Sequence, residues 1–150
     1  MDLLAIFDNR VLGSALVAWG LAQLLKLPLE YLKTREWNWG VLASAGGMPS
    51  SHSALIVGAT HAIGLYVGFD SPLFALAVAV TMIVTYDAAG VRRQAGFQAQ
   101  KINLMVKELF TGHIISEKDL REVLGHSPLE VVGGIFLGIV VTQLLWFFWR

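Results

Sequence analysis

Two histidines lie at equivalent places in the sequence, each where a polar connection meets an apolar segment. His52 follows a loop in GGMPSSHSA, and His126 precedes an apolar segment in LGHSPLE. Each is flanked by residues that favour a helix start: Ser50 and Ser51, and Ser127 and Pro128. A helix N-terminus has backbone N–H groups without helical partners and a positive dipole end, so it favours anions.

Two imidazoles beside cationic side chains form a set suited to phosphoryl transfer. One neutral imidazole attacks phosphorus while an acidic partner orients it, and a protonated imidazole donates to the leaving oxygen. Arginine and lysine stabilise the charge on the other phosphoryl oxygens. Without such groups, phosphomonoesters hydrolyse extremely slowly. The alternative for His52 is an imidazole that hydrogen-bonds a loop carbonyl at a helix start.

The composition places these groups in a membrane protein. The chain has 150 residues, of which 55% are hydrophobic and only 15% charged, whereas soluble domains are about 25% charged. A bilayer span needs roughly 20 mostly apolar residues. Four segments qualify: Val11–Leu27, Ser53–Phe69, Pro72–Ala89 and Leu129–Trp149. We therefore predict one all-α domain over residues 1–150, a polytopic bundle of about four transmembrane helices.

The connections between these segments carry their own signals. Pro28 is expected to close the first span, and the short GFDSP to join the second and third as a hairpin. In the long connection, apolar residues recur at helical spacing and predict an amphipathic helix on the membrane surface: Ile102, Met105, Val106 and Leu109. Ser116 with Asp119 predicts a capping box that opens a short helix to Leu124.

The distribution of charge predicts the orientation. With four spans, the 28–52 and 90–128 connections share one face, and nine basic residues are expected there: Lys26, Lys33, Arg35, Arg92, Arg93, Lys101, Lys107, Lys118 and Arg121. The positive-inside rule makes this face cytoplasmic, most simply in a cell membrane. The formal net charge of zero gives no indication of a nucleic-acid partner, and the absence of cysteine excludes disulfides and thiolate metal sites.

Other polar and small residues in the spans have expected structural roles. Asp87 is predicted to pair with Arg92 or Arg93, because an unpaired carboxylate at a membrane edge is costly. His61 is predicted to form a hydrogen bond between helices. Three glycines predict close helix packing, within the chain or across a homodimer: Gly133, Gly134 and Gly138.

Three separated motifs carry a family resemblance. GGMPSSHSA, DAAGVRRQAGFQAQKIN and LGHSPLEVVGG together resemble the divergent branch of the type-2 phosphatidic acid phosphatase superfamily, which is related to vanadium haloperoxidases. The resemblance extends from about Gln23 to Gly138. It implies a membrane-embedded, metal-independent phosphatase, so we expect no metal or cofactor. The superfamily usually has six spans, and four would be a reduced version.

The resemblance also implies catalytic roles. The superfamily's Pro-Ser-Gly-His motif supplies the histidine that protonates the leaving group, and Pro49-Ser50-Ser51-His52 matches it with serine in place of glycine. The last motif is Ser-Arg, five residues, His, three residues, Asp. Its counterpart is Arg121, four residues, His126, three residues, Glu130. His126 is then the nucleophile and Glu130 the orienting carboxylate, although Ser127 to Glu130 also forms a capping-box sequence that explains Glu130 without catalysis.

The phosphate-binding residues are less sharply defined. The superfamily's first motif is Lys, six residues, Arg-Pro; Lys26 can pair with Lys33 at that spacing or with Arg35. GVRRQAG marks the divergent branch, and Arg92 or Arg93 can supply the guanidinium. The complete set of candidate substrate-binding residues is Lys26, Arg35, Ser50, Ser51, Arg92, Arg93 and Arg121.

The resulting hypothesis is an enzyme that hydrolyses a lipid or polyprenyl phosphate monoester, or a pyrophosphate, through a phosphohistidine. The irregular first and last motifs leave two alternatives open. The protein could bind an anionic lipid without turnover, or it could be a structural membrane protein whose basic face docks a partner.

Overall fold

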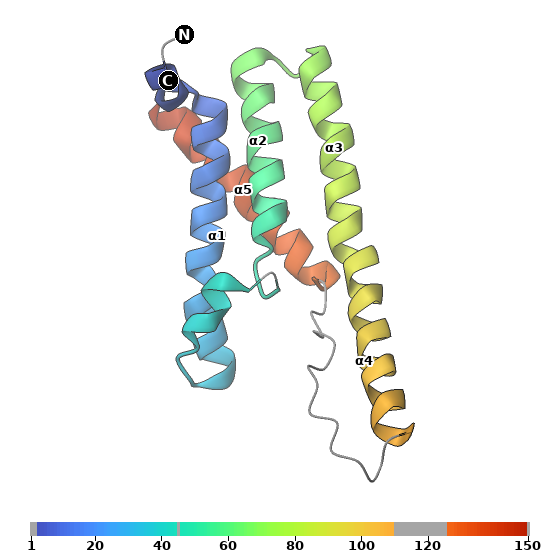
Figure 1. The fold of residues 1–150 in the computed structure, drawn as a ribbon. Helices are drawn as coiled ribbons and strands as arrows, with labels where there is room; N and C mark the ends of the chain where they lie inside the picture. The colour runs from blue at the N-terminus through green and yellow to red at the C-terminus, as the bar shows by residue number, and fades with distance from the viewer. Residues whose placement is uncertain (1–2, 45, 110–125, 150) are drawn as a thin grey trace.

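The computed structural model describes residues 3–44, 46–109 and 126–149, apart from the side chains of residues 3–5, 91–93 and 107–109. The regular structure in this part of the chain is all helical, as the sequence predicts (Figure 1). The elements in order are η1 (Leu3–Asp8), α1 (Arg10–Thr34), η2 (Trp39–Ala43), α2 (Ser51–Val67), α3 (Pro72–Ala89), α4 (Val91–Leu109) and α5 (Pro128–Phe148). The predicted helix after Ser116 lies outside the described residues.

Three helical segments of the described chain are long and apolar enough to cross a membrane: Arg10–Thr34, Pro72–Val106 and Pro128–Phe148. They correspond to three of the four predicted spans. The fourth, α2, is also helical but has only 17 residues. At about 1.5 Å per residue it extends roughly 25 Å, slightly less than the hydrocarbon core of about 30 Å. The chain is thus a polytopic helical bundle with a short helix among longer ones.

The short helix α2 is the centre of the bundle, because α1, α3 and α5 all pack against it. The contacts are close because the facing residues are small. A Cβ atom at Gly58 would lie 3.1 Å from the Ala18 Cβ of α1 and 3.4 Å from the Thr142 Oγ1 of α5. Small residues at helix interfaces are typical of membrane bundles, where van der Waals contact and not water exclusion drives association.

Polar side chains also join the helices. Thr60 of α2 and Thr81 of α3 share a hydrogen bond of 2.7 Å between their hydroxyls. The Thr142 hydroxyl donates to the Gly58 carbonyl at 3.2 Å. His61 Nε2 lies 3.1 Å from Gln143 Oε1, which confirms the prediction that His61 forms a bond between helices.

Pro28, which is expected to close the first span, does not end the helix, because α1 continues to Thr34. Proline inside a helix removes one hydrogen bond and usually ends or kinks it. Here the last turns are stabilised by contacts with the returning chain. Trp37 stacks on Tyr31 with ring centroids 4.5 Å apart, and η2 packs against α1.

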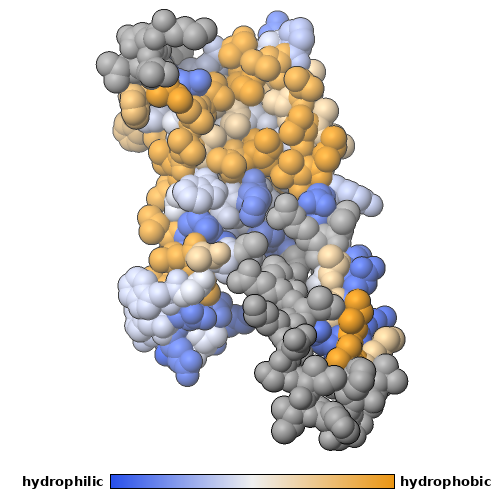
Figure 2. All heavy atoms as spheres, viewed as in Figure 1, coloured by the Kyte–Doolittle hydropathy of each residue, from blue (hydrophilic) through white to orange (hydrophobic). Residues whose placement is uncertain are grey.

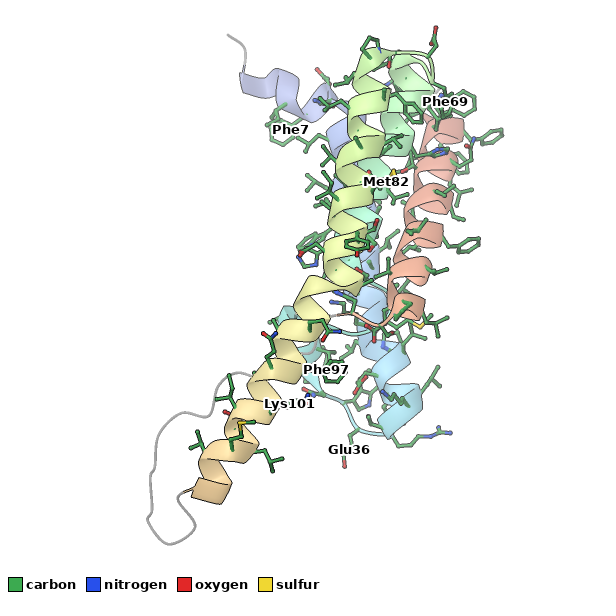
Figure 3. The ribbon with its side chains drawn as sticks, turned by 90° about the vertical axis from the view of Figure 1, so that its right-hand side faces the viewer. Phe7, Glu36, Phe69, Met82, Phe97 and Lys101 are labelled. Atoms are coloured by element: carbon green, nitrogen blue, oxygen red, sulfur yellow. The ribbon has the colours of Figure 1, made fainter. Side chains whose placement is uncertain are left out.

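The amphipathic segment after α3 forms the helix α4, but it does not turn aside from the third span. The Gly90 N–H donates to the Tyr86 carbonyl at 2.9 Å, and the Gln94 N–H donates to the Gly90 carbonyl at 3.0 Å. Helical hydrogen bonding therefore continues across the junction. As a result α4 prolongs the direction of α3 and projects beyond the other helices (Figures 1 and 3).

The two ends of the bundle differ in polarity. The end of α1, η2 and α4 lie at one end, where Glu36 and Lys101 are found; Phe7 and Phe69 lie at the other (Figure 3). Hydrophobic side chains gather towards the second end, and hydrophilic ones towards the first (Figure 2). The 28–52 connection and the start of the 90–128 connection thus share one end, as the count of spans predicts.

Candidate active site

The N-termini of α2 and α5 meet at the hydrophilic end of the apolar bundle. The N-cap residues are Ser50 for α2 and Ser127 for α5. A backbone hydrogen bond links the two starts: the Ser50 N–H donates to the Glu130 carbonyl at 2.9 Å. Two positive helix ends therefore lie beside each other, which creates an environment that favours an anion.

These helix starts bring the two candidate histidines together. The His52 and His126 rings have centroids 6.0 Å apart and planes inclined by 75°. His126 is only 2% exposed and His52 is half-buried. A reacting nitrogen must approach within about 3 Å of the atom it attacks or protonates. The 6.0 Å separation joins the ring centres, so the two imidazoles are close neighbours at one site.

Glu130 forms the capping box that its sequence position predicts. Its Oε2 accepts from the Ser127 N–H at 2.9 Å, and the Ser127 Oγ accepts from the Glu130 N–H at 3.4 Å. The box turns the carboxylate back towards the residue that directly follows His126. A carboxylate accepts several hydrogen bonds, so the cap leaves Glu130 able to act on a second group.

Lys26 is a buried cation near the starts of α2 and α5. The residue is 2% exposed, although it lies in a largely apolar helix. Its Nζ donates to the Ser44 carbonyl at 3.0 Å, and its charge interacts with the Glu130 carboxylate. A charge buried in a membrane helix requires such partners and is by default a functional candidate.

Ser50 and Ser51 are both buried at the start of α2. The Ser50 Oγ accepts from the Ser53 N–H at 3.3 Å and from the Ser53 hydroxyl at 3.0 Å. Ser50 therefore has a capping role, and it retains one hydroxyl proton to donate. The binding of substrate by Ser50 and Ser51 stays a prediction.

Of the remaining predicted phosphate-binding cations, the structure describes the side chain of Arg35. Arg35 is exposed at the C-cap of α1, nine residues or about 13 Å of helix beyond Lys26, and its binding of substrate stays a prediction. Arg92 and Arg93 belong to the first turn of α4, and their side chains lie outside the described part, as does the whole of Arg121. The predicted pairing of the half-buried Asp87 with an arginine stays a prediction.

One feature of the site was not anticipated from the sequence: the Ser44 carbonyl receives the Lys26 ammonium. The predicted close helix packing is confirmed at Gly134, where a Cβ would lie 2.8 Å from the Ser53 Cβ. Gln23 gave a partial signal, because it lies one turn before Lys26 and donates to the Leu42 carbonyl at 2.9 Å. Two polar residues on one face of an apolar helix indicate a polar segment packed against it.

Comparison with known proteins agrees with the three sequence motifs around His52, Arg92 and His126. The family model described as the Divergent PAP2 family matches residues 7–141, which include both histidines, Lys26 and Glu130. The chain belongs to the Divergent PAP2 family. The resemblance expected from the three motifs is thereby confirmed.

A relative of similar length supports the membrane assignment. The Divergent PAP2 chain is 38% identical over 155 residues to the "Uncharacterized membrane protein YuiD" of Bacillus subtilis (strain 168), covering 95% of this chain and 98% of that protein. No solved structure matches the chain. With its apolar helices, the Divergent PAP2 chain is a membrane protein related to phosphatases.

Proposed function

We propose that this protein is a membrane phosphatase that hydrolyses a lipid or polyprenyl phosphate monoester, or a pyrophosphate, through a phosphohistidine. The observation that carries the proposal is the pair of imidazoles, 6.0 Å apart at two converging helix N-termini. The membership of a family named for its divergence from the phosphatases supports the same chemistry.

In the first step, a neutral imidazole nitrogen of His126 attacks phosphorus. The new phosphorus–nitrogen bond forms as the phosphorus–oxygen bond to the lipid breaks, and protonated His52 gives its proton to the departing oxygen. Glu130 orients His126 and stabilises the positive charge that the ring acquires. The capping box supports this role, because it directs the carboxylate towards the helix start.

In the second step, water attacks the phosphohistidine. His52, now neutral, takes the proton of the water, the phosphorus–nitrogen bond breaks, and inorganic phosphate leaves. His52 is then protonated again and His126 is neutral again, so the cycle closes. Lys26 and the N–H groups of the two helix starts stabilise the phosphoryl oxygens in both steps. Arg92, Arg93 and Arg121 remain candidates for the same task.

The place of the site supports a lipid as the substrate. The helices α2 and α5 begin where the apolar part of the bundle gives way to its hydrophilic end (Figure 2). A phosphate headgroup at that level can enter the site while its hydrocarbon chains stay in the bilayer. We propose that residues 1–150 act as one domain in the cell membrane, with the hydrophilic end of the bundle on the cytoplasmic side.

One observation favours a second candidate, an anionic-lipid-binding protein without turnover. Lys26 donates to the Ser44 carbonyl, and Glu130 accepts in the capping box. Both charges thus have structural partners, which a protein that has lost catalysis would preserve. This candidate predicts tight binding of phosphate or vanadate with no phosphate release.

The experiment that tests the proposal measures phosphate release by the purified protein in detergent. The substrates are phosphatidic acid, phosphatidylglycerophosphate and undecaprenyl mono- and diphosphate. We expect release from at least one of them and a loss of at least about 100-fold in His126→Ala. The control is His61→Ala. It removes a histidine that lies further along α2 and bonds Gln143 of α5, and it should retain activity. Equal rates for His126→Ala and the wild type would contradict the proposed mechanism.

A further inference from the structure

Gly134 lies where the α5 backbone passes close to the start of α2. A Cβ atom at this position would overlap the Ser50 carbonyl oxygen, and it would lie 2.8 Å from the Ser53 Cβ and 3.2 Å from the Ser50 carbonyl carbon. Ordinary Cβ contacts begin at about 3.4 Å. The absence of a side chain at Gly134 is therefore what allows the two backbones to touch.

This contact adjoins the hydrogen bond that links the two helix starts. The Ser50 N–H donates to the Glu130 carbonyl, which lies one helical turn before Gly134. Ser50 thus meets α5 twice, through its N–H and through its own carbonyl. His52 lies two residues after Ser50, and His126 lies four residues before Glu130, so any shift of α5 at this point changes the separation of the rings.

The neighbouring glycines differ from Gly134 in what they face. A Cβ at Gly133 would meet the Cε of Met48 at 3.3 Å, the tip of a flexible side chain that can move away. A Cβ at Gly138 would lie 2.8 Å from the Ala54 carbonyl oxygen, also backbone but one turn further from the histidines. Within this glycine set, Gly134 alone adjoins Ser50.

We propose that Gly134 is a positioning residue: by letting α5 touch α2 at Ser50, it sets the separation of His52 and His126. The inference depends on the proposed function, in which both rings act on one phosphoryl group. A displacement of about 1 Å at a reacting centre can cost roughly 100-fold in rate. A methyl group at residue 134 would therefore impair the chemical step more than substrate binding.

The test compares Gly134→Ala with Gly133→Ala in the full-length protein in detergent, because both changes add one methyl group to the interior of the same helix. Phosphate release gives kcat and KM, and calorimetry gives the affinity for orthovanadate, which mimics the transition state of phosphoryl transfer. For Gly134→Ala we expect kcat to fall about 10- to 100-fold with KM within about threefold. The affinity for vanadate should fall by a similar factor. Gly133→Ala should stay within about twofold of the wild type in both measurements.

Gly138→Ala separates positioning from general loosening of the interface. It adds a methyl group against the α2 backbone away from the histidines, so it should lower thermal stability as Gly134→Ala does but change kcat by less than about threefold. Equal losses of kcat in the two variants at equal stability would overturn the proposal.

Ser53→Thr provides a second route if Gly134→Ala does not fold. It adds a methyl group from the α2 side of the same contact and keeps the hydroxyl that bonds Ser50. We expect kcat at least about threefold below that of the wild type, and an unchanged kcat would overturn the proposal.

The outcomes also distinguish this inference from the proposed function. A wild type that hydrolyses lipid phosphate while Gly134→Ala matches it overturns the positioning role alone. A wild type that binds vanadate without turnover refutes the phosphatase, and a fall in vanadate affinity in Gly134→Ala still supports positioning. A wild type that neither hydrolyses a lipid phosphate nor binds vanadate overturns both.

Discussion

The Ser50 N–H donates to the Glu130 carbonyl at 2.9 Å, and this single backbone bond joins the starts of α2 and α5. Segments that are far apart in the sequence thereby place two imidazoles 6.0 Å apart. Because the bond is made by backbone atoms, a side-chain substitution at either residue keeps both its donor and its acceptor. Variants can therefore remove one side chain at a time and leave this connection in place.

Ser50→Ala should destabilise the protein without abolishing activity. The change removes the N-cap of α2, and the expected loss is about 1 kcal/mol in the free energy of unfolding. Ser71→Ala is the matched control, because the Ser71 Oγ caps α3 by accepting from the Phe74 N–H at 3.2 Å, away from the histidines. Chemical unfolding in detergent measures both losses. A loss of activity of more than about tenfold in Ser50→Ala, with none in Ser71→Ala, would show that the Ser50 hydroxyl binds substrate.

Lys26→Met should impair both folding and substrate binding. It removes the donor to the Ser44 carbonyl and the positive partner of Glu130, with an expected cost of about 1–3 kcal/mol in stability. KM for lipid phosphate should rise at least about tenfold if the ammonium binds the phosphoryl oxygens. Lys33→Met, in the exposed last turn of the same helix, should change neither quantity. Unfolding curves and initial rates provide the comparison, and a wild-type KM in Lys26→Met would exclude direct binding.

Glu130→Gln should separate the two roles of this carboxylate. Glutamine can still accept from the Ser127 N–H, so the capping box persists and stability should fall by less than about 1 kcal/mol. The negative charge is lost, and kcat should fall at least about tenfold. Glu130→Ala should lose both the cap and the activity. Retention of full activity in Glu130→Gln would leave Glu130 with the capping role alone.

His52→Ala should have an effect that depends on the leaving group. For an alkyl or polyprenyl phosphate, the loss of the general acid should lower kcat about 100- to 10,000-fold. An aryl phosphate such as p-nitrophenyl phosphate needs no protonation of its leaving group, so its loss should be at least tenfold smaller. Parallel assays of the two substrates check this prediction. Equal losses on both would assign His52 to phosphate binding and not to proton donation.

Much of the fold was accessible from the sequence because it depends on local signals. Apolar length located the helices, and the short GFDSP gave the α2–α3 turn. Ser127 to Glu130 gave a capping box that the structure contains. Pro28 shows the limit of such signals: its local effect is to end a helix, but the stacking of Trp37 on Tyr31 supports the helix beyond it.

The site was only partly predictable, because its geometry depends on contacts between distant segments. The residue types identified His52, His126 and Lys26 as candidates. No local pattern shows that the Lys26 ammonium reaches the Ser44 carbonyl, or that Gly134 faces Ser50 and not lipid. Arg35 illustrates the converse, since it was proposed as a partner of Lys26 and the structure leaves it exposed at the end of α1.

The proposed covalent intermediate is open to a single experiment. The wild-type protein is mixed with lipid phosphate labelled with ³²P and quenched in alkali within milliseconds, conditions under which phosphohistidine survives, and the labelled residue is identified by peptide mapping. We predict label on His126 in the wild type, stronger label in His52→Ala with an aryl phosphate because the loss of the base slows hydrolysis, and none in His126→Ala. Steady phosphate release with no label on His126 at any time would contradict the mechanism.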